Sequence, residues 1–268
     1  MDEHEDRQDR PTEDQGPSRR SIGAPQQFEV PRVQRLRIRV GRGEIDVIGR
    51  DEPGAQVTVH DVSGPALQTE YAEGVLRIGS SKDGGPSARA SITVAVQRDA
   101  AVDIAVVSAE VLVSGMKKGL RVRTVSGGVV CDATAGHAQL EGTSGELALR
   151  EHEGVVDVTT VSGPVTASGA VTRFECAGVS GDLFLDLEAP DRVTAHTVSG
   201  EVVLRLGGDR PASYAINTLS GDLEVDGRTI GRVLGGYRGT WGTPGGEPTR
   251  VQLDSASGTV RIVHSGGV

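Results

Sequence analysis

The chain has 268 residues, of which 38 are glycine and only 3% are aromatic, and its formal net charge is −9. This length allows one or two domains with a sizeable core, and the abundance of β-branched and turn-forming residues indicates an all-β protein. A net negative charge gives no overall basic field for phosphate backbones or anionic lipid, so we expect no nucleic acid partner.

Residues 1–27 mix acids, arginines, proline, glutamine and serine with almost no apolar side chains. Such a segment buries too little surface to offset the entropy cost of ordering, so we predict a disordered charged tail. It also lacks the apolar stretch of a secretory signal, and no run of about 18 apolar residues occurs elsewhere in the chain. We therefore expect no membrane span and a cytoplasmic location.

Residues 28–107 alternate between apolar and polar side chains in short runs separated by Gly, Pro and Asp. This alternation is typical of half-buried strands. The segment is predicted to form an N-terminal sheet that caps the C-terminal part of the chain. The expected strands are 35–40, 43–49, 56–62, 75–79 and 91–97.

Residues 108–268 carry a repeat marked by serines at a nearly constant spacing. The steps between these serines are 18 residues four times, then 19, 21 and 37, and the last step contains a loop insertion at 227–250. A fixed period of about twenty residues is the signature of a solenoid. The serines are Ser108, Ser126, Ser144, Ser162, Ser180, Ser199, Ser220 and Ser257.

Each repeat contains two short segments in which apolar residues alternate with polar ones. The apolar positions are the third and fifth after each serine and the sixth and fourth before the next one. Period-two alternation in two segments predicts two strands per coil, both with apolar side chains inward. The predicted fold is therefore a parallel β-helix with rungs of about 18 residues, stacked at ~4.8 Å.

Ser-Gly dipeptides recur where one predicted strand ends and the next begins. Glycine can adopt positive φ or approach a neighbouring coil there, and serine can hydrogen-bond to nearby backbone. We interpret these serines as structural corners and not as nucleophiles, because the six histidines share no common column with them; we predict no catalytic residues, metal or cofactor. The corners are Ser126, Gly127, Ser144, Gly145, Ser162, Gly163, Ser180, Gly181, Ser199, Gly200, Ser220 and Gly221.

The two cysteines, Cys131 and Cys176, fall on different strands of the coil and about two rungs apart. Stacking would separate them by roughly 10 Å along the axis. This separation exceeds the ~7 Å Cα distance that a disulfide tolerates. Two free, buried thiols are predicted.

The train of "TVSG" and "VSGD" corners with short "V-x-V" strands, preceded by "LRIRVGRGEIDVIG", resembles the bacterial DUF4097 family, whose members are described as adhesins with a β-strand repeat. The resemblance covers about Phe28 to His264. It implies a β-helix and surface adhesion, and it supplies no catalytic residues. The chain differs from a surface adhesin because its sequence contains no recognisable signal or anchor segment.

Two surfaces are candidates for interaction. The outward position four residues after the serine forms an apolar stripe, which includes Leu112, Val130, Phe184 and Val203 and is either an interface or covered by other strands. The insertion at 227–250 carries Tyr237, Arg238 and Trp241 on a glycine-rich loop, which either binds a sugar or peptide or folds over the solenoid.

Acidic residues follow several corners, among them Asp182, Glu201 and Asp222. Stacked carboxylates could hold Ca²⁺, but the repeated Asp-x-Asp loops of dedicated calcium sites are missing. A solvated acidic edge, which also discourages association, is the favoured interpretation.

The leading functional hypothesis is a non-enzymatic β-helical protein that binds or scaffolds an unknown protein or glycan partner, with self-association left open. One alternative is a polysaccharide-active enzyme, which would need two acids and a basic residue on one outward face in adjacent rungs; the sequence pattern indicates no such cluster. Another is a cytoplasmic bactofilin-like filament former, which would stack end to end through the open edge of the final segment "SGTVRIVHSGGV".

Overall fold

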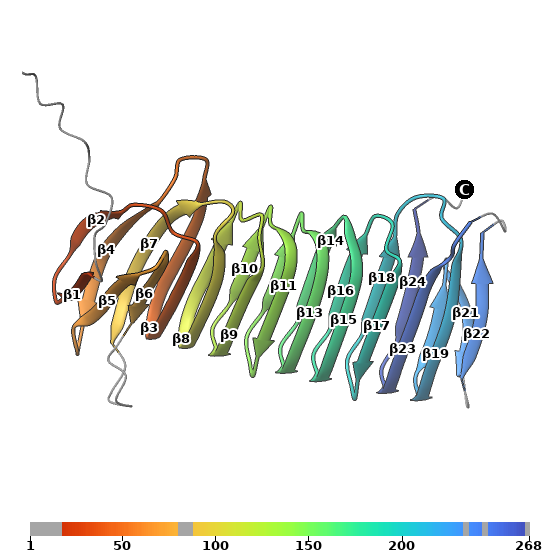
Figure 1. The fold of residues 1–268 in the computed structure, drawn as a ribbon. Helices are drawn as coiled ribbons and strands as arrows, with labels where there is room; N and C mark the ends of the chain where they lie inside the picture. Colours follow the sequence, from red (N-terminus) through yellow and green to blue (C-terminus); the bar gives the residue numbers. More distant parts are fainter. Residues whose placement is uncertain (1–17, 80–87, 233–235, 243–245, 266–268) are drawn as a thin grey trace, which may run out of the picture.

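The computed structural model describes residues 18–79, 88–232, 236–242 and 246–265 (Figure 1). These residues form 24 strands and no helix, and most neighbouring strands run parallel. The predicted all-β class is confirmed. Since the described residues contain no helix, none of them forms a helix long and apolar enough to cross a membrane.

The strands lie in two long rows that share two members, β3 (Arg35–Arg50) and β8 (Ala101–Ser114), which are parallel register partners and run through both rows. The first row, row A, is in spatial order β1 (Ser18–Ile22), β5 (Leu67–Ala72), β6 (Val75–Gly79), β3, β8, β9 (Leu120–Ser126), β11 (Ala135–Gly142), β13 (Glu153–Ser162), β15 (Val171–Ser180), β17 (Arg192–Thr197), β23 (Thr249–Ser257), β19 (Ala212–Ser220) and β22 (Tyr237–Trp241).

Row B contains the later halves of β3 and β8 and is otherwise separate from row A. Its order is β2 (Gln26–Val30), β4 (Ala55–Ser63), β7 (Arg89–Gln97), β3, β8, β10 (Val129–Asp132), β12 (Leu147–Arg150), β14 (Val165–Gly169), β16 (Leu183–Leu187), β18 (Val202–Leu206), β24 (Val260–His264), β20 (Asp222–Val225) and β21 (Arg228–Arg232).

The apolar columns of the repeat form the core. Equivalent residues of neighbouring strands are direct register partners, so that Val156 faces Phe174 and Phe174 faces Val193. All residues predicted to point inward are buried except Val225, which is half-buried. Phe174 is among the largest side chains that are fully buried. The period-two pattern therefore identifies the inward face of both rows correctly.

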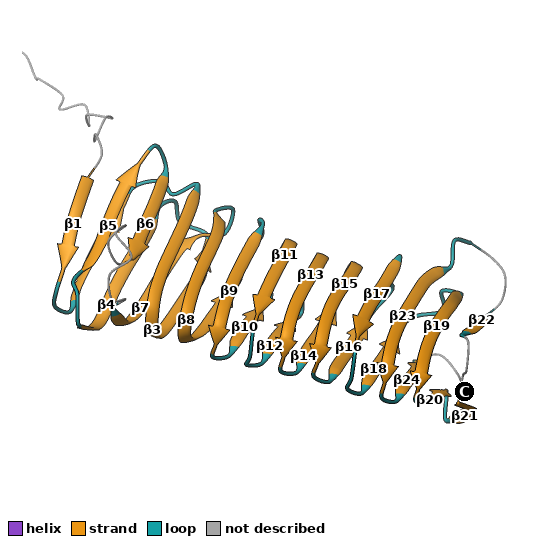
Figure 2. Ribbon diagram, turned by 90° about the horizontal axis from the view of Figure 1, so that it is seen from below, coloured by secondary structure: helices purple, strands orange, loops and turns teal. Residues whose placement is uncertain are grey.

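The corners, which are the turns between the two rows, lie in one line along the structure (Figure 2). The backbones of successive corners are in close contact. Gly163 has φ +118°, and a Cβ added to it would lie 2.2 Å from the carbonyl oxygen of Gly145 in the neighbouring repeat. The hydroxyl of Ser162 donates a hydrogen bond to the carbonyl oxygen of Thr143 at 3.2 Å, and Ser126 does the same to Val107 at 3.3 Å. Glycine and serine thus have separate roles, one allowing close approach and the other connecting the repeats.

The last repeat of the chain is not the last in space. Strand β23 lies between β17 and β19, and β24 lies between β18 and β20. The expectation that Val260–His264 leaves an open edge is therefore wrong. The insertion at 227–250 is long enough to carry the chain back, so that the final repeat pairs on both sides.

Antiparallel strands occupy both ends of the rows. At one end β1 and β2 pair with β5 and β4, and at the other β22 and β21 pair with β19 and β20. A change of strand direction at an end limits further parallel pairing there. The region expected to be an N-terminal cap also contributes β3 to both parallel rows, and the predicted boundary at residue 107 falls inside β8.

Part of the predicted disordered tail is ordered. Residues 18–22 form β1, whose Ile22 is only 1% exposed and whose Arg19 pairs with Glu70 at 2.8 Å. The edge of β5 and one buried isoleucine are enough to order this short segment, which composition alone did not indicate. The remainder of the predicted tail, residues 1–17, lies outside the described residues.

Both cysteines are free and buried, as predicted. Cys131 lies on β10 in row B and Cys176 on β15 in row A. Burial raises the pKa of each thiol to about 12, so neither is a thiolate near neutral pH.

We expect Gly163→Ala to destabilise the protein strongly, because the new methyl group would meet the Gly145 carbonyl oxygen at a backbone conformation that favours glycine. The conformational strain alone is worth roughly 1–3 kcal/mol, and the steric conflict adds to it. Gly23→Ala is the matched control, since nothing lies within 4 Å of the position of its Cβ. Chemical denaturation measures both changes; equal stability of the two variants would contradict the proposed role of the corner.

Candidate functional site

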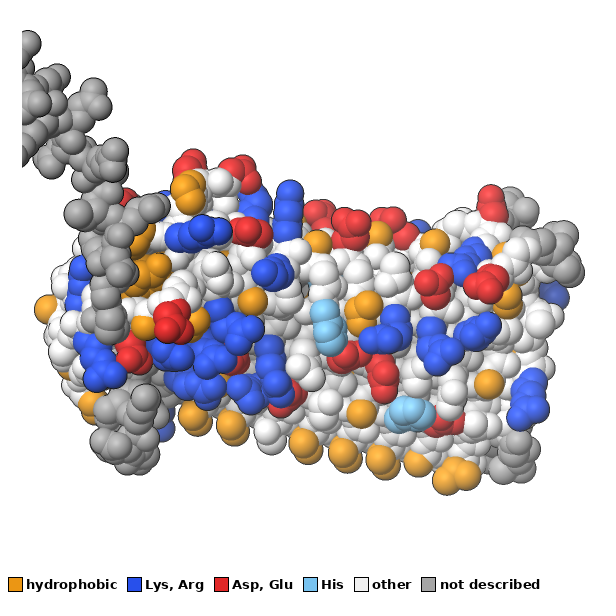
Figure 3. All heavy atoms as spheres, in the orientation of Figure 1, with side chains coloured by type: hydrophobic (Ala, Val, Ile, Leu, Met, Phe, Trp, Pro, Cys, Tyr) orange, Lys and Arg blue, Asp and Glu red, His pale blue; other side chains and the backbone are white. Residues whose placement is uncertain are grey.

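Arginines gather on the outward face of row A near the N-terminal end (Figure 3). Successive outward positions of β3 carry three of them, and β6 and β9 on either side of the β3–β8 pair carry the others. We call this group the arginine patch. It consists of Arg35, Arg37, Arg39, Arg77, Arg121 and Arg123.

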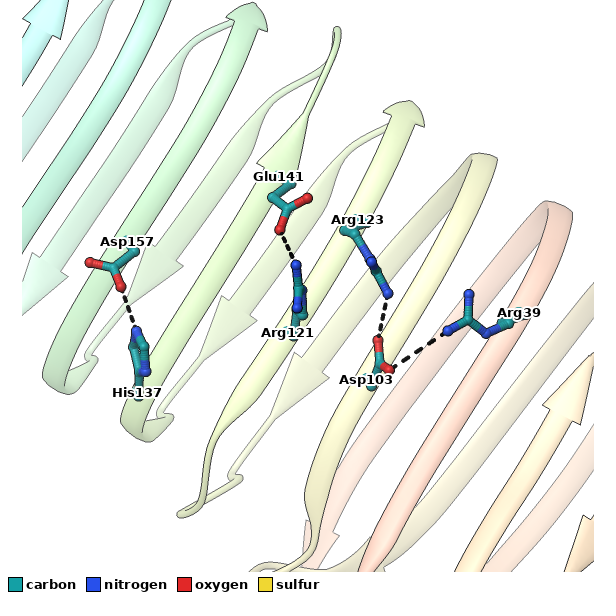
Figure 4. A network of polar contacts seen from close by, with 7 residues as sticks. All are labelled: Arg39, Asp103, Arg121, Arg123, His137, Glu141 and Asp157. Carbon is teal, nitrogen blue, oxygen red and sulfur yellow. Dashed lines mark hydrogen bonds and ion pairs between the residues drawn. The ribbon is translucent and has the colours of Figure 1, made fainter.

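Asp103 lies at the centre of the patch and is shared by several guanidinium groups (Figure 4). Its carboxylate is 3.3 Å from Nη2 of Arg123, 3.8 Å from Nη2 of Arg39 and 3.9 Å from Nε of Arg37. Arg121 pairs with Glu141 at 2.6 Å. Only the first and last of these distances allow direct hydrogen bonds, so one aspartate neutralises its neighbours incompletely.

Among the residues that the structure describes, the arginines of the patch outnumber the carboxylates around them. Six arginines face three carboxylates there, those of Asp103, Glu141 and Glu70, and the last of these also bonds to Arg19. The buried Nε atoms of Arg37, Arg121 and Arg123 have no hydrogen-bond partner. Guanidinium groups in such a cluster suit carboxylate or phosphate oxygens, which they can bind in a bidentate manner.

A groove of about 350 Å³ runs beside these arginines. Arg35, Arg37 and Arg121 line it together with Asp103 and His137. The lining therefore offers three guanidinium groups to a ligand, with a carboxylate and an imidazole beside them. The alternation of apolar and polar residues in these strands predicts that the arginines point outward. It does not predict that they lie close together, because this depends on β6, β3, β8 and β9 being neighbours in space.

An acid pair lies on the same face, beyond the patch. Asp157 and Glu175 are register partners on β13 and β15, and Arg173 lies two residues before Glu175 on the same face. His137 Nε2 is 2.5 Å from a carboxylate oxygen of Asp157. One cluster of two acids and a basic residue on one outward face in adjacent repeats is therefore present, whereas the sequence predicts no regular recurrence of such clusters.

A row of apolar side chains follows the corner edge (Figure 3) and was missed by the sequence reasoning. Each is the residue before the corner serine, and Val107, Val125, Val161 and Val179 are all 50% exposed. The sequence pattern indicates only that the valine of "TVSG" belongs to a corner motif, and the structure shows that its side chain is half exposed to solvent. The full row is Val107, Val125, Thr143, Val161, Val179, Val198, Ala256 and Leu219.

The predicted apolar stripe lies on the outward side of row B but is interrupted. Leu112 and Phe184 are 38% and 40% exposed, whereas Val130 and Val203 are half-buried. Ala148, between the two pairs, is buried at 1% exposure. The stripe therefore consists of two small apolar patches, and its role in interaction stays a prediction.

The insertion at 227–250 folds against the end of the rows. The ring of Trp241 stacks on that of His264, with 3.8 Å between centroids and 5° between planes. His264 Nδ1 is 2.9 Å from an oxygen of Asp226, and its Nε2 contacts the hydroxyl of Tyr214. Burial, together with the Asp226 charge, raises the pKa of Tyr214.

This packing separates the three predicted loop residues. Trp241 and Tyr237 are half-buried against the core, whereas Arg238 is exposed on β22. His264 covers one face of the Trp241 ring. Of the three residues Arg238 is the exposed one, and ligand binding through this loop stays a prediction.

The acidic residues after the corners are engaged by neighbouring repeats. Asp182 accepts a hydrogen bond from the backbone amide of Glu201 at 2.9 Å, and Glu201 pairs with Arg261 at 3.0 Å. Thr259 lies between Glu201 and Asp222, because the last repeat is inserted there. Among the residues that the structure describes, no group of three or more His, Cys, Asp or Glu side chains could hold a metal ion.

No family model and no curated protein matches the chain in sequence. Among solved structures the chain is similar to a candidate adhesin from Bacteroides fragilis, with 11% identity and a TM-score of 0.49 over 94% of this chain and 98% of that one. It is also similar to a candidate lipid-binding protein from Parabacteroides distasonis, with 17% identity and a TM-score of 0.47 over 92% and 96% of the two chains.

A candidate cell adhesion protein from Clostridium sporogenes aligns over 90% of this chain and all of that chain, with 12% identity and a TM-score of 0.32. Likenesses of this degree carry no argument about ligand or activity. Membership of the DUF4097 family stays a prediction.

His152 provides a prediction about pH. It is 1% exposed, its Nδ1 lies 2.9 Å from Oγ1 of Thr134, and its Nε2 has no partner. Burial lowers the pKa of His152 below its ordinary value of 6.5. The unfolded chain therefore binds a proton that the folded chain does not, and stability falls as the pH drops below about 6.5.

His152→Asn, which does not titrate, should show a smaller loss of unfolding free energy between pH 7.5 and the acid side of this range, about pH 5.5. His60→Gln, at an exposed histidine, should retain the pH dependence of the wild type. Urea denaturation at both pH values measures the difference. An unchanged pH dependence in His152→Asn would show that His152 does not carry this effect.

Proposed function

We propose that the chain is a parallel β-helix and that it acts as a non-enzymatic binding protein. The pairing supports the helix, because β9 and β10, β11 and β12, and each following pair pass once through row A and once through row B. A rod of this kind presents long outward columns held by a stacked backbone. Such a rigid framework is suited to positioning binding groups.

The arginine patch is the proposed binding surface, and its excess of guanidinium groups over carboxylates is the observation that carries the proposal. A chain with net charge −9 concentrates six arginines within a few neighbouring strands. The guanidinium groups of the patch repel one another because they are close together. They attract an anion more strongly in a groove, because the protein walls limit screening by water. The ligand chemistry that fits is a partner bearing carboxylate or phosphate groups.

Binding of poly-L-glutamate tests the patch. We expect Arg37→Gln combined with Arg121→Gln to weaken binding by at least about ten-fold at low salt, since each lost charge-assisted hydrogen bond is worth roughly 1.5–3 kcal/mol. Arg205→Gln with Arg261→Gln is the control, because it removes the same total charge from two arginines that pair with Asp186 and Glu201 on row B. Isothermal titration calorimetry distinguishes the variants; equal weakening by the control would reduce the effect to net charge.

The enzymatic alternative is favoured by one observation, the acid pair of Asp157 and Glu175 beside Arg173. Two carboxylates on adjacent strands could act as acid and base on a polysaccharide. The hydrogen bond of His137 to Asp157 is more consistent with an ion-paired surface position. We therefore retain the non-enzymatic proposal.

The bactofilin-like alternative loses the open edge on which it depended, because β24 is paired on both sides. Association of the chain with itself remains a prediction. So does the location of the protein in the cell.

A further inference from the structure

A second arginine group lies on row A, away from the patch, on the right-hand half of the view in Figure 3. Arg173, Arg192 and Arg250 are register partners on β15, β17 and β23, which are consecutive in space. All three are exposed. Adjacent strands bring their backbones to ~4.8 Å from one another, and we call the group the arginine ladder.

Among the described residues the arginine ladder has no acidic partner, because none of its three side chains makes a hydrogen bond or ion pair there. Several other arginines pair with acids of neighbouring repeats. Examples are Arg205 with Asp186 at 3.3 Å, Arg210 with Asp191 at 2.6 Å and Arg261 with Glu201 at 3.0 Å.

The two acids that are close in sequence do not compensate the ladder. Asp191 precedes Arg192 directly but bonds to Arg210. Glu175 lies on the same face as Arg173 without forming an ion pair with it. Like charges in direct register on adjacent strands are destabilising, so this arrangement leaves a concentrated positive charge that an external anion can neutralise.

Neutral hydrogen-bonding groups lie beside the ladder. A groove of about 310 Å³ is lined by Arg192 and Arg250 together with Thr194, Ser213 and Gln252. Hydroxyl and amide side chains of this kind can donate to and accept from the hydroxyls of a sugar. Arg238, one of the predicted interaction residues, is exposed on β22, where it is the register partner of Ala215 in the same lining.

The chemistry of the groove favours a glycan over a nucleic acid. Its one aromatic residue, Tyr214, is 4% exposed and points into the core, so that no ring is available for a base to stack on. Base stacking on aromatic side chains is a main source of affinity for single strands. A polymer with oxyanions for the arginines and hydroxyls for the groove matches both kinds of group present.

We propose that the arginine ladder binds a linear anionic glycan, with carboxylate or sulfate groups contacting Arg173, Arg192 and Arg250 in succession. The chain of sugars lies across the strands, along row A, because successive arginines follow that direction. Thr194, Ser213 and Gln252 bond to its hydroxyls. The inference rests on the proposed role as a binding protein but uses residues separate from the arginine patch.

Calorimetric titration of the full chain with polygalacturonate and, separately, heparin tests the proposal and distinguishes carboxylate from sulfate as the anion. We expect binding of at least one of them at low salt, loss of that binding near 0.5 M NaCl, and no binding of neutral dextran. Arg192→Gln with Arg250→Gln should weaken it by at least about ten-fold. Arg205→Gln with Arg261→Gln, which removes the same total charge from acid-paired arginines of row B, should weaken it by less than about two-fold. The double variant should unfold at the same or a higher temperature, because the substitution relieves repulsion.

Several outcomes would overturn the proposal: no binding of either glycan, unchanged binding by the double variant, equal binding of dextran, or equally tight binding of single-stranded DNA. Arg37→Gln with Arg121→Gln separates the two proposals. If this patch variant loses polyglutamate binding but keeps glycan binding, both sites are supported. If glycan binding is lost in the patch variant and kept in the ladder variant, the glycan binds the patch and the ladder proposal is refuted. New reducing ends formed during incubation with the glycan would refute the non-enzymatic role that both share.

Discussion

The close approach of backbone at the corners is the constraint on which the rest of the structure depends. Successive corner glycines leave only 2.2 Å between the position of a Cβ on Gly163 and the carbonyl oxygen of Gly145, and the same separation recurs between Gly181 and Gly163. Serine hydroxyls bond across the same step. The register between flat, uniform strands can slip. A corner with this close backbone approach permits one register only, and that register aligns every column of side chains in the two rows.

Aligned columns turn a short repeat into extended surfaces. On the outward side of row A, and counting only the described residues, the arginine patch at one end has fewer carboxylates than arginines, and the three arginines of the ladder further along pair with no carboxylate. Acids occupy the strands between them, among them Glu141 on β11 and Asp157 on β13. The protein is acidic in total and yet presents two separate cationic surfaces, so its net charge says little about the anions that it can bind.

The sequence predicted the inward columns correctly, because burial imposes period-two alternation and the period aligns the repeats. It could not predict the order of the last two repeats: Val251 and Tyr214 occupy equivalent columns, and nothing in the spacing says that β23 inserts beside β17. The arginine ladder was hidden for the same reason, since Arg192 and Arg250 are far apart in the chain and become neighbours only through this insertion.

Other features were missed because they depend on tertiary contacts that the local pattern does not encode. Ile22 is buried in a strand that pairs with the edge of β5, and one face of the Trp241 ring is covered by the imidazole of His264. Val161 has the same chemical character as the core valines, so its 50% exposure follows from its position just before the corner. Local pattern thus predicted which face of a strand is buried, but not which distant segments meet.

Amide hydrogen exchange of Val260–His264 is the measurement that tests the account most directly, because the insertion of the final repeat both sets the order of the last strands and assembles the arginine ladder. If β24 lies between β18 and β20, these amides should exchange by global unfolding and be protected as strongly as those of β16. The amides of the edge strand β22 should exchange much faster. Rapid exchange throughout Val260–His264, at the rate of β22, would contradict the inserted repeat and with it the stacked corners on which the account rests.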